Sequence, residues 1–152
     1  MLNLDTHVLV FAVSGALRPA ERALLARDRW SVSAIVLWEL AKLIQLGRVG
    51  MDLDDRDVAG VLDRVHVWPI DLDVARASTR LDFKGDPADE IIAATSVVHV
   101  VPLVTRDRVI RQSKIVPLET VGAVTSEAMH ARAPLTARAV PPGAAGGVRA
   151  FD

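Results

Sequence analysis

The chain has 152 residues, about half of them apolar, and a formal net charge of −1. This length predicts one domain with a substantial hydrophobic core, and the charge balance argues against a surface coated in positive charge for nucleic acid, although a local basic patch is compatible with it. Cysteine is absent, which excludes disulfide bonds and thiolate zinc sites.

Short apolar runs alternate with helical patterns along most of the chain. In the first half we predict a strand at residues 2–4, a short helix or turn at 7–11, a helix at 19–29, a strand at 30–33 and a helix at 34–46. In the second half we predict a helix at 54–65, a strand at 67–70, helices at 71–81 and 87–99, a strand at 100–105, a short helix at 108–112 and a strand at 115–118. Strands that alternate with helices imply βα units. We therefore predict an α/β fold with a central, mostly parallel sheet of about four or five short strands covered on both faces.

Composition divides the chain into two parts. Residues 1–121 carry the predicted elements, whereas residues 122–152 are rich in Ala, Gly and Pro and have no apolar periodicity, so we expect a flexible tail. The beginning of the chain lacks the basic and apolar regions of a signal peptide. No stretch reaches the ~18 consecutive apolar residues of a transmembrane helix. We expect a cytoplasmic protein.

Two aspartates come at the ends of predicted strands. Asp5 follows the strand at residues 2–4, and Asp107 follows the apolar run that ends at Thr105. Ligands of parallel sheets bind at the carboxyl ends of the strands. Aspartate is also among the best residues for capping the start of a helix, so capping is an adequate alternative explanation for both.

Glu39 lies on the apolar side of the helix predicted at residues 34–46. With about 100° per residue, Leu43 and Leu46 flank it on the helical wheel, whereas Lys42 lies on the other side. A carboxylate that points into an apolar face is unfavourable unless it is paired or bound to a cation. The alternative explanation is a pair with a buried arginine.

Asp89 lies at the start of the helix predicted at residues 87–99. In this segment Asp86 is suited to cap the helix, Pro87 to occupy its first turn, and Asp89 to place negative charge near its N-terminus. A favourable helix start therefore explains these residues without any function. Asp89 also shares a helix face with Ala93, which places it beside the strand ends.

The four acids considered together indicate a single site. In a parallel sheet, Asp5, Glu39, Asp89 and Asp107 can converge on one crevice. Four carboxylates within a few ångströms cannot all stay ionised without cations. All-oxygen sites suit hard divalent ions such as Mg²⁺ or Mn²⁺, and such ions can activate a water for phosphodiester hydrolysis. The pattern predicts a metal-dependent hydrolase.

Several short motifs surround these acids along the chain. They are Leu4-Asp5-Thr6, Ser33, Glu39-Leu40, Asp86-Pro87-Ala88-Asp89 followed by residues 91–95, and Leu103-Val104-Thr105-Arg106-Asp107. In order and spacing the chain resembles the PIN-domain ribonucleases, and among them the VapC-type toxins of bacterial type II toxin–antitoxin pairs. The resemblance covers residues 1–121, and the block around Asp89 is its most specific part.

The resemblance implies a PIN-like α/β/α sandwich that cleaves RNA endonucleolytically with Mg²⁺ (or Mn²⁺). It also implies a homodimer and inhibition by a cognate antitoxin protein. Carried over position by position, the catalytic and metal-binding residues are Asp5, Glu39, Asp89 and Asp107, and the supporting hydroxyls are Thr6, Ser33 and Thr105. Two features depart from the family: Glu90 stands where relatives often have arginine, and the tail has no counterpart.

Basic residues gather in the sequence around the third and fourth acids. As phosphate contacts they would offset the repulsion between an acidic site and RNA; the alternative is an ordinary solvated surface. These candidate substrate-binding residues are Lys84, Arg106, Arg108, Arg111 and Lys114. His7 can also approach the site, although a histidine in such a place more often packs or faces water.

Two other enzyme or signalling folds fit the sequence less well than a toxin nuclease. A haloacid-dehalogenase-like phosphatase would need a second aspartate where His7 stands. A receiver domain would need paired acids before its phosphorylated aspartate and a late lysine in a set place, and the sequence fits this pattern badly. A PIN-domain nuclease that matures cellular RNA stays open as an alternative. A non-catalytic PIN-like scaffold for RNA or protein binding is a further alternative, and the presence of all four acids argues against it.

Overall fold

The computed structural model describes residues 1–120. The tail predicted at residues 122–152 lies outside the described residues and stays a prediction. Within residues 1–120, no helix is long and apolar enough to cross a membrane.

The described residues form short strands and short helices in alternation. The strands are β1 (Leu2–Leu4), β2 (Trp30–Ser33), β3 (His66–Trp68) and β4 (Leu103–Val104). The helices are α1 (Thr6–Val13), α2 (Pro19–Leu25), α3 (Ala34–Gln45), α4 (Arg56–Leu62), α5 (Leu72–Ser78) and α6 (Pro87–His99), followed by a 3₁₀ turn, η1 (Ile110–Gln112).

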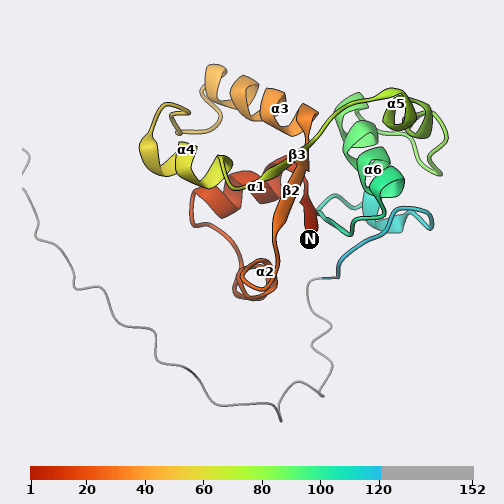
Figure 1. The fold of residues 1–152 in the computed structure, drawn as a ribbon, viewed down its shortest axis with the longest axis horizontal. Coiled ribbons are helices and arrows are strands. Elements are labelled where there is room, and N and C mark those ends of the chain that lie inside the picture. The colour runs from red at the N-terminus through yellow and green to blue at the C-terminus, as the bar shows by residue number, and fades with distance from the viewer. Residues whose placement is uncertain (121–152) are drawn as a thin grey trace, which may run out of the picture.

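The four strands form one parallel sheet in the order β3-β2-β1-β4. Figure 1 shows α1, α3 and α4 on one side of the sheet and α5 and α6 on the other. The predicted α/β class with a parallel sheet covered on both faces is therefore confirmed. Because β1 lies between β2 and β4, the residues that follow β1 and β4 meet at the same edge.

The end of the sheet differs from the prediction. The strand expected at residues 115–118 is reduced to a single bridge between Leu118 and Leu103. The strand expected at residues 100–105 is β4 alone, because Val100 caps α6 with φ 53° and Pro102 has no N–H for a sheet hydrogen bond.

Several helices and one strand are also shorter than predicted. The helix expected at 19–29 ends at Leu25, whose carbonyl accepts the Trp30 indole N–H at 2.8 Å. The helix expected at 54–65 begins at Arg56, because the Asp55 carboxylate accepts the N–H groups of the next turn. The helix expected at 71–81 covers 72–78, and the strand expected at 67–70 covers 66–68.

One continuous core fixes the helices that carry the acids. Leu40 of α3 and Ile92 of α6 are buried in the same cluster as Leu4 of β1. Asn3 of β1 is also buried, and its Nδ2 donates to Ser96 Oγ of α6 at 2.8 Å. Since Leu40 follows Glu39 and Ile92 lies one turn after Asp89, this packing holds both acids near the sheet.

Candidate active site

A surface pocket of about 350 Å³ opens beside the ends of β1 and β4. It is lined by Asp5, His7, Phe11, Asp89, Arg106 and Asp107, and we call it the acid pocket. Asp5 follows β1, Asp107 lies in the loop after β4, and Asp89 is in the first turn of α6. Three of the four predicted acids therefore come together from segments that are far apart in the sequence.

Asp5 is bound by the end of the neighbouring strand and does not cap α1. It occupies the N-cap position, yet its side chain makes no capping hydrogen bond. Instead, Thr105 Oγ1 donates to Asp5 Oδ2 at 2.5 Å. The capping alternative for Asp5 is therefore wrong. Burial raises the pKa of Asp5 above its ordinary value, and the hydrogen bond from Thr105 opposes this rise.

Glu39, the fourth predicted acid, does not line the acid pocket and instead contacts α1. Its Oε2 accepts a hydrogen bond from Thr6 Oγ1, and no described arginine pairs with it. The alternative of a buried arginine partner is therefore wrong. Burial raises the pKa of Glu39, and the charges of Asp5 and Asp86 raise it further. Glu39 therefore interacts electrostatically with Asp5 of the acid pocket.

Asp89 has a strongly raised pKa. Burial, followed by the charges of Asp5, Asp107 and Glu39, raises the pKa of Asp89 to about 6. Capping of α6 is left to Asp86, whose Oδ1 accepts from the Ala88 N–H at 2.9 Å. A helix start therefore explains Asp86, whereas Asp89 is placed among other carboxylates.

Asp107 binds the turn that follows it and also lines the acid pocket. Its Oδ1 accepts from the N–H groups of Val109 at 2.7 Å and Ile110 at 2.9 Å, so the capping alternative is confirmed for this acid. Its own N–H donates to Thr105 Oγ1 at 3.0 Å. The Thr105 hydroxyl thus joins Asp107 to Asp5. Because one Asp107 oxygen makes the cap, the other is left for contacts in the acid pocket.

The donor set fits a hard divalent cation that keeps part of its water shell. Within residues 1–120, no three acidic or histidine side chains are arranged to hold one ion by themselves. Mg²⁺ commonly binds through one or two carboxylates and several waters, so it does not need such a cage. The pKa values of Asp5, Glu39 and Asp89 are raised. A bound cation would lower these pKa values, because a positive charge favours ionised carboxylates.

Comparison with known protein families decides what kind of domain this is. The PIN-domain model matches residues 3–115.

This chain belongs to the PIN-domain family.

Individual relatives agree with the family match. The PIN domain is 32% identical over 120 residues to Ribonuclease VapC22 of Mycobacterium tuberculosis, which covers 73% of this chain and 90% of that protein. A toxin–antitoxin complex from Klebsiella pneumoniae is similar with a TM-score of 0.55 and 22% identity over 70% of this chain and 87% of its own. VapBC2 from Rickettsia felis, in a structure bound to a promoter DNA fragment, is similar with a TM-score of 0.59 and 20% identity. The match covers 78% of this chain and 98% of that chain. These two structural likenesses show the fold.

The predicted basic residues do not gather around the acid pocket of the PIN domain. Of the five, Arg106 lines it. The other four, which are Lys84, Arg108, Arg111 and Lys114, are exposed and stand outside its lining. Lys114 instead lines a separate hollow with Asp82, whose carboxylate accepts the Lys114 backbone N–H at 2.7 Å. A phosphate contact by these four residues stays a prediction.

The structure also shows the surroundings of Ser33, a predicted supporting hydroxyl, and of Glu90, the residue that departs from relatives. Ser33 is fully buried at the start of α3, and its Oγ has no hydrogen-bond partner among the described residues. Glu90, the departure from relatives, accepts the Gly85 N–H through Oε1 at 3.2 Å. Glu90 therefore closes the loop before α6 and does not line the acid pocket.

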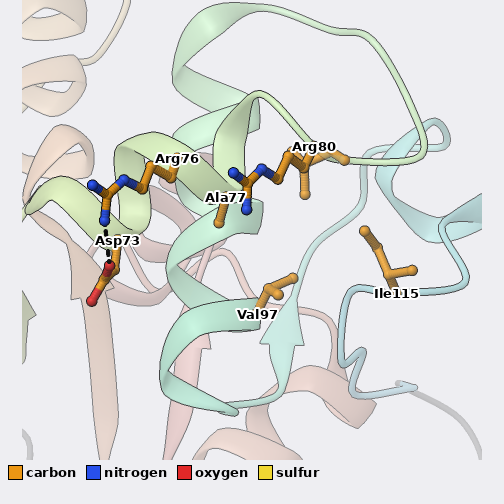
Figure 2. Close-up of a pocket in the computed structure, with 7 residues that line it drawn as sticks. Asp73, Arg76, Ala77, Arg80, Val97 and Ile115 are labelled. Atoms are coloured by element: carbon orange, nitrogen blue, oxygen red, sulfur yellow. Dashed lines mark ion pairs between the residues drawn. The ribbon is translucent and has the colours of Figure 1, made fainter.

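A larger cavity of about 630 Å³ lies elsewhere in the PIN domain. Figure 2 shows its lining, which includes Arg76 of α5, Arg80 just after that helix, Val97 of α6 and Ile115. Among the described residues that line it, Asp73 is the one acid, and it pairs with Arg76 at 3.6 Å. This cavity lacks the grouped carboxylates that metal-dependent hydrolysis needs.

Glu21 is a residue near the site that the sequence did not point to. It lies in α2, is 3% exposed, and forms an ion pair with Arg106 at 2.6 Å. Its position two residues after Pro19 gives it a local use at the helix start, where it accepts the Arg18 N–H. The partner 85 residues away leaves no signal in the local sequence.

Proposed function

We propose that this PIN domain is a metal-dependent endoribonuclease and the toxin of a toxin–antitoxin pair. The observation that carries the proposal is the convergence of Asp5, Asp89 and Asp107 in one pocket, with Glu39 close enough to share their field. A stable fold gains nothing from this arrangement, because like charges brought together and partly buried destabilise the folded state. Relatives that carry the names ribonuclease and toxin–antitoxin complex support the same assignment.

The four carboxylates, Asp5, Glu39, Asp89 and Asp107, are the residues that would hold Mg²⁺ or Mn²⁺. When bound, the ion supplies an activated water and charge stabilisation at the phosphodiester. Thr105 holds Asp5 and Asp107 in fixed positions through one hydroxyl, and Thr6 does the same for Glu39. Fixed oxygen ligands limit the reorganisation needed during the reaction, which favours catalysis.

Cleavage of RNA is the first test. Purified protein is expected to cut single-stranded RNA internally in Mg²⁺ or Mn²⁺ and to stop when EDTA is added, because the carboxylates alone repel the phosphate. The measurement is the appearance of internal fragments from an end-labelled RNA. Excess Mg²⁺ added back after EDTA serves as the control. Cleavage that continues unchanged in EDTA would contradict a metal-dependent nuclease.

The toxin role has a separate test, because a nuclease that matures cellular RNA would share the same site. We expect expression of the chain in a bacterial host to arrest growth, and co-expression of a small neighbouring gene to relieve the arrest. Such relief would identify the antitoxin partner, and mapping of new RNA ends after induction would identify the target in the cytoplasm. Intact RNA cleavage without growth arrest would favour the maturation nuclease. The implied homodimer stays a prediction.

A further inference from the structure

Arg106 is held beside the acid pocket by a buried carboxylate. Its Nε donates to Glu21 Oε1 at 2.7 Å, and its Nη2 donates to Glu21 Oε2 at 2.6 Å. Glu21 is 3% exposed, and its Oε2 also accepts the Arg18 N–H at 2.8 Å. The carboxylate is therefore fixed by three hydrogen bonds, and a two-pronged contact of this kind fixes the plane of a guanidinium as well as its position.

A second contact holds the face of the same guanidinium. The Cζ atom of Arg106 lies 4.1 Å from the centre of the Phe11 ring, a distance at which a cation and an aromatic ring attract each other. Phe11 and Arg106 both line the acid pocket with Asp5, Asp89 and Asp107. One edge and one face of the guanidinium are thus occupied by the protein at the margin of the pocket.

The remaining edge of Arg106 carries donors that Glu21 does not use. Glu21 engages Nε and one N–H of Nη2, which leaves the N–H groups of Nη1 and the second N–H of Nη2. The Arg106 side chain as a whole is 28% exposed, and it lines the acid pocket. A guanidinium edge of two adjacent nitrogens matches two oxygens of a phosphate. Of the five predicted phosphate-binding cations, Arg106 alone is at the pocket.

We propose that Glu21 is a positioning residue: it holds the Arg106 guanidinium at the acid pocket so that the Nη1 edge binds an RNA phosphate. This inference rests on the proposed nuclease function. The role matters because a phosphate that enters the pocket meets several carboxylates, and one oriented cation offsets part of that repulsion. The competing explanation is that the pair only fastens α2 to the loop after β4.

The sign of the change in RNA binding separates these explanations. Glu21→Gln removes one negative charge near the pocket, so simple electrostatics predicts tighter binding of RNA. Loss of the oriented guanidinium predicts the opposite, a roughly tenfold weaker binding and a higher KM, which is the effect of one lost charge-assisted hydrogen bond. Affinity is measured in an Asp89→Asn background with Mg²⁺, so that the RNA stays intact.

Matched variants show whether Glu21 acts through Arg106. In an Arg106→Gln protein, adding Glu21→Gln is expected to change RNA affinity by less than about twofold, because the group that it positions is already gone. Asp73→Asn removes an acid from the exposed arginine pair of α5 and is expected to leave RNA affinity within about twofold of wild type. An effect of Glu21→Gln that is equally large with and without Arg106 would show that Glu21 does not act through Arg106 and would overturn the inference.

A second variant covers the case in which Glu21→Gln does not fold. Arg106→Lys keeps the charge and a partner for Glu21 but loses the planar fork, so we expect RNA binding to weaken by roughly tenfold. Thermal melting verifies that each variant is folded. Wild-type affinity in folded Glu21→Gln, or in Arg106→Lys, would overturn the inference. A wild-type protein that binds RNA without cutting it would instead contradict the proposed nuclease, and the binding comparison would still decide the role of Glu21.

Discussion

Asp89→Asn is expected to lower RNA cleavage by roughly 100- to 1000-fold, the range seen when a group that stabilises transition-state charge is removed. The same substitution is expected to make the metal-free protein more stable. Burial and neighbouring carboxylates raise the pKa of Asp89 to about 6, so at pH 7 the native state holds an ionised group that it disfavours. Asparagine cannot ionise, and the gain is on the order of 1 kcal/mol once solvent screening of this half-buried group is considered.

Activity and stability should therefore change in opposite directions. Cleavage of an end-labelled RNA gives the first quantity, and urea unfolding in EDTA at pH 7 gives the second. Glu90→Gln is the matched control, since Glu90 is the next residue in α6 and lies outside the acid pocket; we expect its cleavage rate to stay within about twofold of wild type. Wild-type cleavage by the Asp89→Asn protein would remove Asp89 from the active site.

The second large effect concerns the metal-free protein, whose stability is expected to fall as the pH rises. The folded-state pKa values of Asp5, Glu39 and Asp89 are raised, so these groups favour the native state only while they are protonated. Their contribution is fully present below about pH 4, the ordinary range of carboxyl groups, and is lost as the pH rises through the pKa of Asp89 at about 6.

Mg²⁺ or Mn²⁺ should reverse this loss at neutral pH. A ligand at a hundred times its dissociation constant stabilises the native state by about 2.7 kcal/mol, whereas protonated carboxyl groups at pH 5 bind the ion weakly. The measurement is the free energy of unfolding in EDTA and in Mg²⁺ between pH 5 and 8. Glu21, whose pKa the Arg106 contact lowers, stabilises the native state throughout that window and loses this contribution only at more acidic pH. Equal stabilisation by Mg²⁺ at pH 5 and pH 8 would contradict a carboxylate site.

Local sequence signals predicted the fold well where they were strong. The bounds of α6 agree with the prediction at both ends, because Asp86 and Pro87 mark its start. The extent of β4 could not be predicted, since Val100 adopts a left-handed conformation that a β-branched residue rarely takes. The end of α2 depends on the Trp30 indole bound to the Leu25 carbonyl, a contact that no local pattern reveals.

In the acid pocket, too, the sequence predicted some features, whereas others depend on contacts between distant segments. Asp5 and Asp107 both follow a strand, and capping explained either of them equally well from the sequence. They differ because the Thr105 hydroxyl donates to Asp5, whereas Asp107 accepts the N–H groups of its own turn. The convergence of the acids followed from parallel topology, which the sequence predicted. The partner of Arg106 did not, because Glu21 lies in a separate helix.

The position of β1 between β2 and β4 has a consequence for protein synthesis. Asp5 leaves the ribosome early, but its hydrogen-bond donor Thr105 is made 100 residues later. Arg106 and Asp107 belong to that same late segment. A nascent chain that lacks this segment has neither Arg106 and Asp107 of the acid pocket nor β4, which pairs with β1. The proposed toxin is therefore expected to lack a complete acid pocket until this late segment has been translated.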